Sequence, residues 1–367
     1  MNTAELREWL LLNGGPAIQL NIQFSHSANR GIDINAVSDL LDIPKVKSIL
    51  DYIDGFDTRL RDKKTLEHLI HYYKDSCIEK FFPRLIDLGF RAGMPIFDEK
   101  MQLIKEIFSY MLSENYDYCY YYRLMLHQFF FVAGYDYPEV VNSMIQRLNK
   151  IHIAAKGRVY EIYQDKSSLP KVPQHWIDRR VLKDDLNPFG QSSEKPLPTI
   201  YDIKALAYFP CVYRSKEVQE KINDVIDYIL DPIFQKIPEG YGLLWIKDRR
   251  IYQVCGWSPT LPLYEAYDRP QHLSINALLD CLEIMSNFKA AHKSKWFIES
   301  LSYFEQFKTE NGTYIFPRDH FNSKYIEEAF LSKKSLNLKQ NERQYILYEL
   351  VSTLRMLRII DRINDRE

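Results

Sequence analysis

Two adjacent segments near the middle of the chain have different patterns of hydrophobic positions. From Tyr116 to Gly134, apolar or aromatic residues occupy every face of a helix. A helix that is apolar on all sides is normally buried on all sides. In the next segment, six apolar residues fall on one stripe at helical spacing: Val140, Val141, Met144, Ile145, Leu148 and Ile151. The two segments therefore predict a buried inner helix followed by an outer helix with one exposed face.

This pair of inner and outer helices recurs along the chain. A second apolar segment opens at Asp202, and a third opens at Ser274. In both cases a glycine follows 38 residues later, Gly240 after Asp202 and Gly312 after Ser274. A helical hairpin of this kind buries its apolar face against its neighbours in a stack. The repeat therefore predicts an all-α fold in which hairpins form a solenoid or close into a ring.

Two insertions interrupt the repeat. Residues 163–198 contain five prolines and little periodicity, which predicts a long ordered loop that acts as a lid or as a packing brace. Residues 242–246 and 251–255 are apolar segments on either side of the polar turn KDRR. This arrangement predicts a small β-hairpin.

The N-terminal part of the chain also has helical spacing. It is visible in residues 34–52, with a break expected at Pro44, and in the longer stretch 65–90. We therefore expect an N-terminal helical segment of residues 1–60 that packs on a helical-repeat domain of residues 61–362.

Charge and composition limit the classes of function. In a chain of 367 residues, 48 Lys and Arg balance 49 Asp and Glu, which gives a formal net charge of -1. Such a chain has no general field that would attract nucleic acid or an anionic membrane surface. No apolar run reaches the roughly 20 residues that span a bilayer. We therefore expect no nucleic-acid partner and no membrane span.

The cysteines and the N-terminus indicate a cytoplasmic protein. The five cysteines are far apart and no C-x-x-C occurs, which is typical of reduced thiols. The N-terminal sequence lacks the basic and apolar regions of a signal peptide.

Aromatic residues make up 14% of the chain and are dense in the first inner helix, where Tyr120, Tyr121 and Tyr122 are consecutive. Aromatic rings stabilise cations and accept apolar ligands, so these tyrosines are candidates for the wall of a central cavity. Packing in the core accounts for part of the series equally well, because only one face of an inner helix can point into a cavity. Both alternatives stay open.

The glycine-containing ends of two hairpins resemble a known motif. Lys308-Thr309-Glu310-Asn311-Gly312-Thr313-Tyr314 looks like a degraded Q-x-x-D-G-S-W motif of terpenoid cyclases, and residues 236–242 match it more loosely. With the order of inner and outer helices, residues 60–360 are similar to the terpenoid cyclase and protein prenyltransferase superfamily, and most closely to its functionally undefined bacterial members. The resemblance implies an α/α toroid, in which rings of inner and outer helices surround a central cavity.

The acidic signatures of this superfamily are missing. No D-x-D-D tetrapeptide occurs, and Asp184-Asp185 does not continue as D-D-x-x-D. Asp117-Tyr118-Cys119-Tyr120 does match the D-x-C-Y part of the prenyltransferase zinc site, so the resemblance implies Asp117 and Cys119 as metal ligands. No histidine matches the third ligand. The alternative is that Asp117 caps its helix and that Cys119 is an ordinary core residue.

Four residues are the candidates for a catalytic role. Asp117 and Tyr121 share one face of the first inner helix, and His127 lies on the same helix with Arg123. Asp202 occupies the position in the second hairpin that Asp117 occupies in the first. A buried carboxylate at either position needs a partner, namely a metal, an arginine or backbone N–H groups.

Two functions from different classes follow. The first is a prenyltransferase-like or cyclase-like protein that binds an apolar, isoprenoid-like ligand in a central aromatic cavity, with its reaction undetermined. The second is a non-catalytic helical-repeat scaffold that binds a protein or peptide partner. A zinc-dependent transferase that uses Asp117 and Cys119 is a third alternative. Zinc is therefore the one candidate cofactor.

Overall fold

A computed structural model describes residues 2–24, 32–55, 68–72, 77–114, 117–165, 167, 169–262, 275–318, 321 and 325–364. Over these residues the protein is mostly helical with one small antiparallel sheet, so the all-α prediction is confirmed. The contacts divide the chain into two compact units. Unit 1 comprises residues 1–107 and 274–367, and unit 2 comprises residues 108–273.

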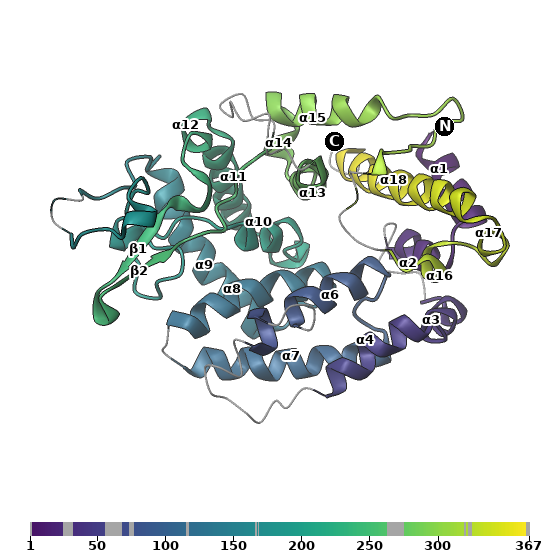
Figure 1. The fold of residues 1–367 in the computed structure, drawn as a ribbon, viewed down its shortest axis with the longest axis horizontal. Helices are drawn as coiled ribbons and strands as arrows, with labels where there is room; N and C mark the ends of the chain where they lie inside the picture. Colours follow the sequence, from purple (N-terminus) through teal and green to yellow (C-terminus); the bar gives the residue numbers. More distant parts are fainter. Residues whose placement is uncertain are drawn as a thin grey trace. The chain divides into compact units, whose positions relative to one another are not determined.

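Unit 1 is assembled from both ends of the chain, coloured purple and yellow-green in Figure 1. The N-terminal part supplies α1 (Thr3–Asn13), α2 (Pro16–Phe24), α3 (Ile34–Leu41), α4 (Pro44–Asp54), a π-helix (His68–Tyr72), α6 (Ile78–Asp87) and most of α7 (Pro95–Ser113). The C-terminal part supplies α13 (Ile275–Met285), α14 (Lys289–His292), α15 (Lys295–Glu305), α16 (Glu327–Phe330), α17 (Lys333–Leu336) and α18 (Gln340–Asn364).

Contacts between these two parts hold unit 1 together. α1 packs along α18, and Arg7 on α1 forms an ion pair with Asp361 on α18. The N–H of Gly15 donates to the carbonyl of Phe330 at 2.7 Å. A Cβ atom at Gly15 would lie 2.5 Å from the carbonyl oxygen of Leu331, so only glycine allows this approach of two backbones.

Charged side chains connect α13 to α18 within unit 1. Arg355, Arg358 and Arg362 lie on one stripe of α18. Arg355 Nε donates to Glu283 Oε2 at 2.9 Å, and Arg358 Nη1 donates to Oε1 at 3.2 Å. Arg362 Nη1 donates to the Glu283 carbonyl at 2.7 Å. Burial alone would raise the pKa of the Glu283 carboxyl, but the three arginines outweigh burial and lower it to about 2.

The four main helices of unit 2 form two layers. α8 (Asp117–Val132) packs along α10 (Ile200–Ala207), and α9 (Pro138–Lys156) packs along α11 (Lys216–Leu230), which the short α12 (Pro232–Gln235) follows. From Tyr122 to Phe131 every side chain of α8 is buried, whereas α9 has one exposed face. The hydrophobic pattern predicts both properties.

Turn chemistry explains where these helices end. α8 ends before Gly134, whose φ of 89° is readily adopted only by glycine. The pattern predicts a helix that begins at Asp202 and extends to Arg214, but α10 ends at Ala207. Pro210 lacks an N–H group and restricts the residue before it, so the helix cannot continue. Arg214 donates to three carbonyls at this helix end, those of Leu206, Ala207 and Phe209.

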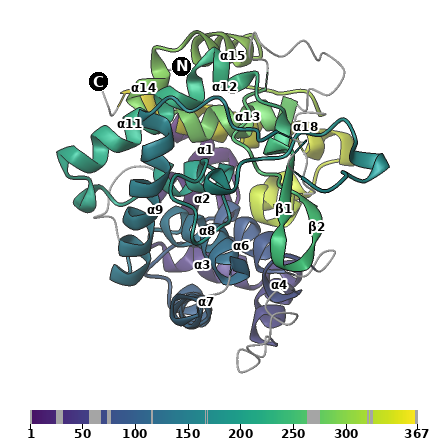
Figure 2. The same ribbon diagram turned by 90° about the vertical axis from the view of Figure 1, so that its left-hand side faces the viewer.

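A β-hairpin of unit 2 is formed by β1 (Leu243–Ile246) and β2 (Ile251–Val254), drawn in green in Figure 2. The strands pair antiparallel with Leu243 opposite Val254, as the sequence predicts. Unit 2 also contains short 3-10 helices. Two lie in the insertion (Gln174–Trp176 and Asp184–Leu186), one follows α10 (Cys211–Tyr213), one precedes β1 (Glu239–Tyr241) and one connects β1 to β2 (Lys247–Arg249).

The insertion at residues 163–198 packs against this hairpin. Val172 and Val181 form a buried apolar cluster with Leu243 and Tyr252. Backbone hydrogen bonds continue the contact, because the N–H of Leu243 donates to the carbonyl of Arg180 at 2.9 Å. The described residues of the insertion therefore pack as a brace for the hairpin, which is one of the two alternatives that its composition left open.

The N-terminal predictions have mixed outcomes. α3 ends shortly before Pro44, which begins α4, so the predicted break is confirmed. In the stretch 65–90, the π-helix and α6 are separate elements, and α6 continues through Pro83. The predicted domain boundary at residue 60 falls within residues 56–67, which lie outside the described part of the chain. Across the residues that are described, no helix is both long enough and apolar enough to cross a membrane.

Candidate functional site

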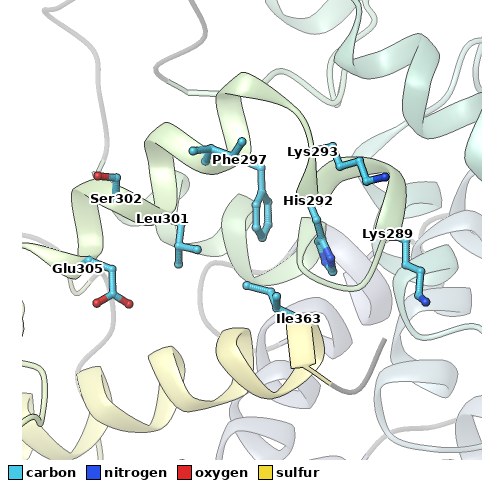
Figure 3. Close-up of a pocket in the computed structure, with 9 residues that line it drawn as sticks. Lys289, His292, Lys293, Phe297, Leu301, Ser302, Glu305 and Ile363 are labelled. Carbon is cyan, nitrogen blue, oxygen red and sulfur yellow. The ribbon is translucent and has the colours of Figure 1, made fainter. Parts of the chain in front are cut away.

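A groove in unit 1 lies between α15, α14 and the C-terminal end of α18 (Figure 3). Its volume is about 710 Å³. α15 begins after Ser294, whose hydroxyl accepts a hydrogen bond from the N–H of Phe297 and caps the helix. Phe297, Leu301 and Glu305 then follow at intervals of four residues, so α15 presents all three on the groove side.

The middle of the groove is apolar. Phe297 and Leu301 point from α15 toward Ile363 of α18 (Figure 3). Phe297 is buried, Leu301 and Ile363 are half-buried, and the neighbouring Ile298 is 56% exposed. Accessible apolar side chains around a hollow are typical of a site for an apolar ligand.

The two ends of the groove carry opposite charges. Lys289 and Lys293 lie at one end and Glu305 lies at the other (Figure 3). The Glu305 carboxylate accepts hydrogen bonds from the hydroxyl of Tyr314 at 2.9 and 3.0 Å. Both lysines are exposed, and neither ammonium forms an ion pair with any described residue. The lysine end is therefore available to an anion.

The lysine end of the groove adjoins the charged contacts between α13 and α18. His292 Nε2 donates to the carbonyl of Ser286 at 2.8 Å, because a carbonyl can only accept. Arg362 Nη1 reaches the hydroxyl of the same serine at 3.4 Å. These contacts fix α14, and with it the two lysines, relative to α13 and α18.

Asp202, one of the residues predicted from the sequence, is in unit 2 and is bound by an arginine. Arg147 on α9 donates from Nε to Oδ1 at 2.9 Å and from Nη2 to Oδ2 at 2.8 Å. Oδ2 also accepts from the backbone N–H and the hydroxyl of Thr199 at 2.8 and 2.9 Å, which completes a capping box at the start of α10. Both carboxylate oxygens of Asp202 are thus occupied by contacts that join α9 to α10.

The guanidinium of Arg147 has further acceptors. It donates to the hydroxyl of Tyr120 at 3.2 Å and to the carbonyl of Leu197 at 3.1 Å. Burial alone would lower the pKa of Arg147, but Asp202 outweighs burial and raises it above its ordinary value. This buried network is closed, since each charged group has its partners within the protein.

His127 is buried on α8, close to this network but not part of it. Its Nε2 lies 3.1 Å from the hydroxyl of Ser143 on α9, and its Nδ1 has no hydrogen-bond partner among the described residues. Burial lowers the pKa of His127 to about 3; Asp202 opposes this shift, and the charges of Arg123 and Arg147 add to it. His127 is therefore neutral at physiological pH, and it donates to or accepts from one serine.

Tyr121 belongs to an aromatic cluster at the N-terminal ends of α8 and α10. Its ring centroid lies 4.9 Å from that of Phe189 in the insertion and 5.4 Å from that of Trp257. Trp257 has a φ of 57°, which is rare for a bulky residue. The strained backbone is held in place because the carbonyl of Trp257 accepts from the N–H of Ile200 at 2.9 Å.

The candidate metal ligands are only partly described. Asp117 is the first residue of α8, but its side chain lies outside the described part of the structure. Cys119 is described and fully buried. Among the side chains that are described, no group of three His, Cys, Asp or Glu residues is arranged to hold a metal ion.

The groove residues were missed by the sequence analysis. Their local signal exists, because Phe297, Leu301 and Glu305 share one stripe of a recognisable helix. The sequence does not reveal that Ile363 lies opposite them, because that contact joins segments about 60 residues apart.

Comparisons with known proteins do not assign this chain to a family. A scan of protein-family models produced no match, and neither did searches of the curated proteins and of the solved structures.

Proposed function

We propose that this protein binds an apolar, isoprenoid-like ligand that ends in an anionic group, and that the groove of unit 1 is the binding site. The observation that carries the proposal is the combination of an accessible apolar middle with two lysines at one end that form no ion pair with any described residue. The charge distribution gives the ligand a direction, with the anion beside Lys289 and Lys293 and the chain beside Leu301.

The dimensions of the groove support a small molecule. A volume of about 710 Å³ lies inside the range of roughly 300–1,000 Å³ that is common for small-ligand sites. An aliphatic chain laid along Leu301, Ile298 and Ile363 would remove these side chains from water. Each buried methylene group contributes about 0.8 kcal/mol, so affinity should rise with chain length.

For the fold, we propose the finer arrangement of an α/α toroid of the terpenoid cyclase and prenyltransferase type. The support is the pairing of α8 with α10 and of α9 with α11, which repeats the order of inner and outer helices. The proposal of a ligand site in the groove does not depend on this arrangement, because every residue used for it belongs to unit 1.

Calorimetric titration with ligands that share one tail tests the proposal. Dodecanoate, dodecylammonium and the branched isoprenoid farnesoate are each added to the full chain below their micelle concentrations. We expect both carboxylates to bind, and dodecylammonium to bind at least about tenfold more weakly, because two lysines repel it. Lys289→Gln with Lys293→Gln should weaken dodecanoate about tenfold, and Leu301→Asn should weaken all ligands.

The matched control is the pair Lys45→Gln and Lys47→Gln, which removes two exposed lysines from α4 in the same unit. This control should leave dodecanoate affinity unchanged. Equal binding of dodecylammonium, or an unchanged affinity in the Lys289 and Lys293 variant, would refute the proposal. Failure of every ligand to bind would also refute it, and would favour the alternative function of a scaffold for a protein partner.

A further inference from the structure

Arg123 is a buried cation that donates to no hydrogen-bond acceptor among the described residues. It lies on α8 in unit 2, and only 8% of its surface is exposed. Its Nε is fully buried without a hydrogen-bond partner. No carboxylate, carbonyl or hydroxyl of the described residues accepts from its guanidinium, which lies over the face of the Tyr120 ring, 5.2 Å from the ring centroid.

Four other arginines of the protein have the kinds of acceptor that Arg123 lacks among the described residues. Arg147 has a bidentate carboxylate, a carbonyl and a hydroxyl. Arg214 has three carbonyls. Arg355 and Arg358 share the carboxylate of Glu283. Arg123 has none of these contacts among the described residues, although its Nε is fully removed from water.

Burying a guanidinium without hydrogen-bond acceptors is unfavourable for the free energy of folding. A guanidinium carries five N–H donors and stays charged at any physiological pH, so it cannot escape by losing a proton. Burial lowers the pKa of Arg123, and Tyr120 and Cys119 oppose this shift without reversing it. Burying part of an ion without a partner is unfavourable, and an arriving anion would offset that cost.

The neighbours of Arg123 favour an anion. Its side chain extends toward the N-terminal turn of α8, since the guanidinium lies over Tyr120, one turn earlier. The N-terminal end of a helix carries a partial positive charge. His127, one turn later, is neutral and offers a ring N–H or a lone pair, and Asp202 is already bound by Arg147.

We propose that Arg123 is the anchor of a second ligand site, which takes one oxyanion, either a carboxylate or a phosphate group. The planar fork of the guanidinium matches both groups with two parallel hydrogen bonds. The anion is either a free ion or the head of a larger molecule. This site is separate from the groove of unit 1 and does not depend on the function proposed for that groove.

Thermal unfolding of the full chain tests the site. Sodium chloride is replaced by sodium phosphate or sodium acetate at constant ionic strength. At an anion concentration about a hundred times Kd, we expect the melting temperature of the wild type to rise by about 4 °C. Arg123→Met should show no rise. Without the anion, Arg123→Met should melt no lower than the wild type, because it removes an uncompensated charge.

Two further variants test whether the planar guanidinium is required and whether the effect is specific to Arg123. Arg123→Lys keeps the charge but loses the fork, so phosphate should bind about tenfold more weakly in calorimetry. Arg214→Met is the matched control: it should destabilise the protein while the rise with phosphate persists, because that arginine is already satisfied.

The source of the anion is distinguished by comparing acetate with octanoate. Tighter binding of octanoate assigns the site to the head of a tailed molecule, and equal binding assigns it to a free ion. The proposal is wrong if anions raise the melting temperature of Arg123→Met as much as that of the wild type. It is also wrong if Arg123→Met is destabilised and no anion affects either protein, since the chain itself would then neutralise Arg123.

Discussion

Arg147 and Asp202 form a bidentate ion pair whose side chains are each only 1% exposed. Nε to Oδ1 is 2.9 Å and Nη2 to Oδ2 is 2.8 Å, so the guanidinium and carboxylate lie edge to edge. The pair joins α9 to the start of α10, so it is a polar link between the two helix layers of unit 2.

Removing one member of this pair should be strongly destabilising. Asp202→Asn leaves Arg147 buried with an uncompensated charge, and we expect the free energy of unfolding to fall by about 3–5 kcal/mol. Urea denaturation measures the change. The double variant Arg147→Met with Asp202→Leu should lose at least about 2 kcal/mol less than the sum of its single variants.

The control for this experiment is an exposed ion pair. Lys216 and Glu220 on α11 are 92% and 64% exposed and 3.9 Å apart. Glu220→Gln should therefore cost no more than about 0.5 kcal/mol. Strict additivity in the Arg147 and Asp202 variants would contradict the view that the two residues act as one unit.

His127 should make the stability of the protein depend on pH in the acidic range. Its pKa is about 3 in the folded protein, against an ordinary value of 6.5 for a histidine in water. The unfolded chain therefore binds more protons between these pH values, and stability falls as pH falls from 6.5 toward 3. The expected loss is about 1.4 kcal/mol for each pH unit in this window.

His127→Gln removes the titrating ring and should flatten this part of the pH profile. Ser143→Ala is the matched control, because it removes the hydrogen bond at 3.1 Å and keeps the ring. It should lower stability and leave the slope intact. Free energies of unfolding from urea titrations between pH 4 and 7 measure both effects, and an unchanged slope in His127→Gln would show that another group is responsible.

Alanine substitutions at two glycines distinguish the cost of backbone strain from the cost of a steric clash. Gly242 and Gly256 have φ values of 92° and 83°, so alanine is strained at both. At Gly256 a new Cβ meets nothing within 4 Å, but at Gly242 it would lie 2.4 Å from the carbonyl oxygen of Arg180. We expect Gly256→Ala to cost about 1–2 kcal/mol and Gly242→Ala at least about 2 kcal/mol more.

The same pair of variants tests the role of the insertion. If residues 163–198 brace the hairpin through the contact of Arg180 with Leu243, Gly242→Ala should increase proteolytic cleavage within the insertion, and Gly256→Ala should not. Limited proteolysis followed by mass spectrometry identifies the cleavage sites. Equal cleavage in the two variants would argue against the brace.

Cys119 provides the test of the zinc alternative. Its thiol is fully buried, so we expect Cys119→Ala to cost about 1 kcal/mol through lost packing and to leave the zinc content of the purified protein unchanged. Elemental analysis of the wild type, Cys119→Ala and Asp117→Asn measures the metal. Stoichiometric zinc in the wild type that disappears in both variants would instead support a zinc site.

Local features of the fold were predictable from the sequence. The contrast between the all-round apolar segment ending at Gly134 and the one-sided segment after Pro138 predicts α8 and α9 because helical periodicity is a local property. The polar turn KDRR predicts the β-hairpin for the same reason. The end of α10 was missed, although Pro210 supplies a local signal that outweighs the apolar pattern.

The candidate sites depend on contacts that no local pattern encodes. Asp202 was singled out from its place in the repeat, and its need for a partner was foreseen, but the sequence does not identify Arg147 as that partner, 55 residues away. Arg123 was one of several polar residues on an apolar helix. What distinguishes it is the absence of any acceptor among the described residues, which only the packed structure can reveal.

The construction of unit 1 from both chain ends has a consequence for synthesis. A ribosome synthesises the chain from the N-terminus at roughly 5–20 residues per second. All of unit 2 is therefore made before α13 and α18 emerge, which delays the completion of unit 1 by on the order of ten to thirty seconds. During that time α1, whose Leu6 and Leu10 are buried in the folded protein, lacks α18 as a packing partner and is open to a chaperone on that side. A ribosome that stalls before residue 274 therefore releases a chain whose N-terminal half of unit 1 lacks its complement, and such nascent chains should be early targets for chaperones and proteases.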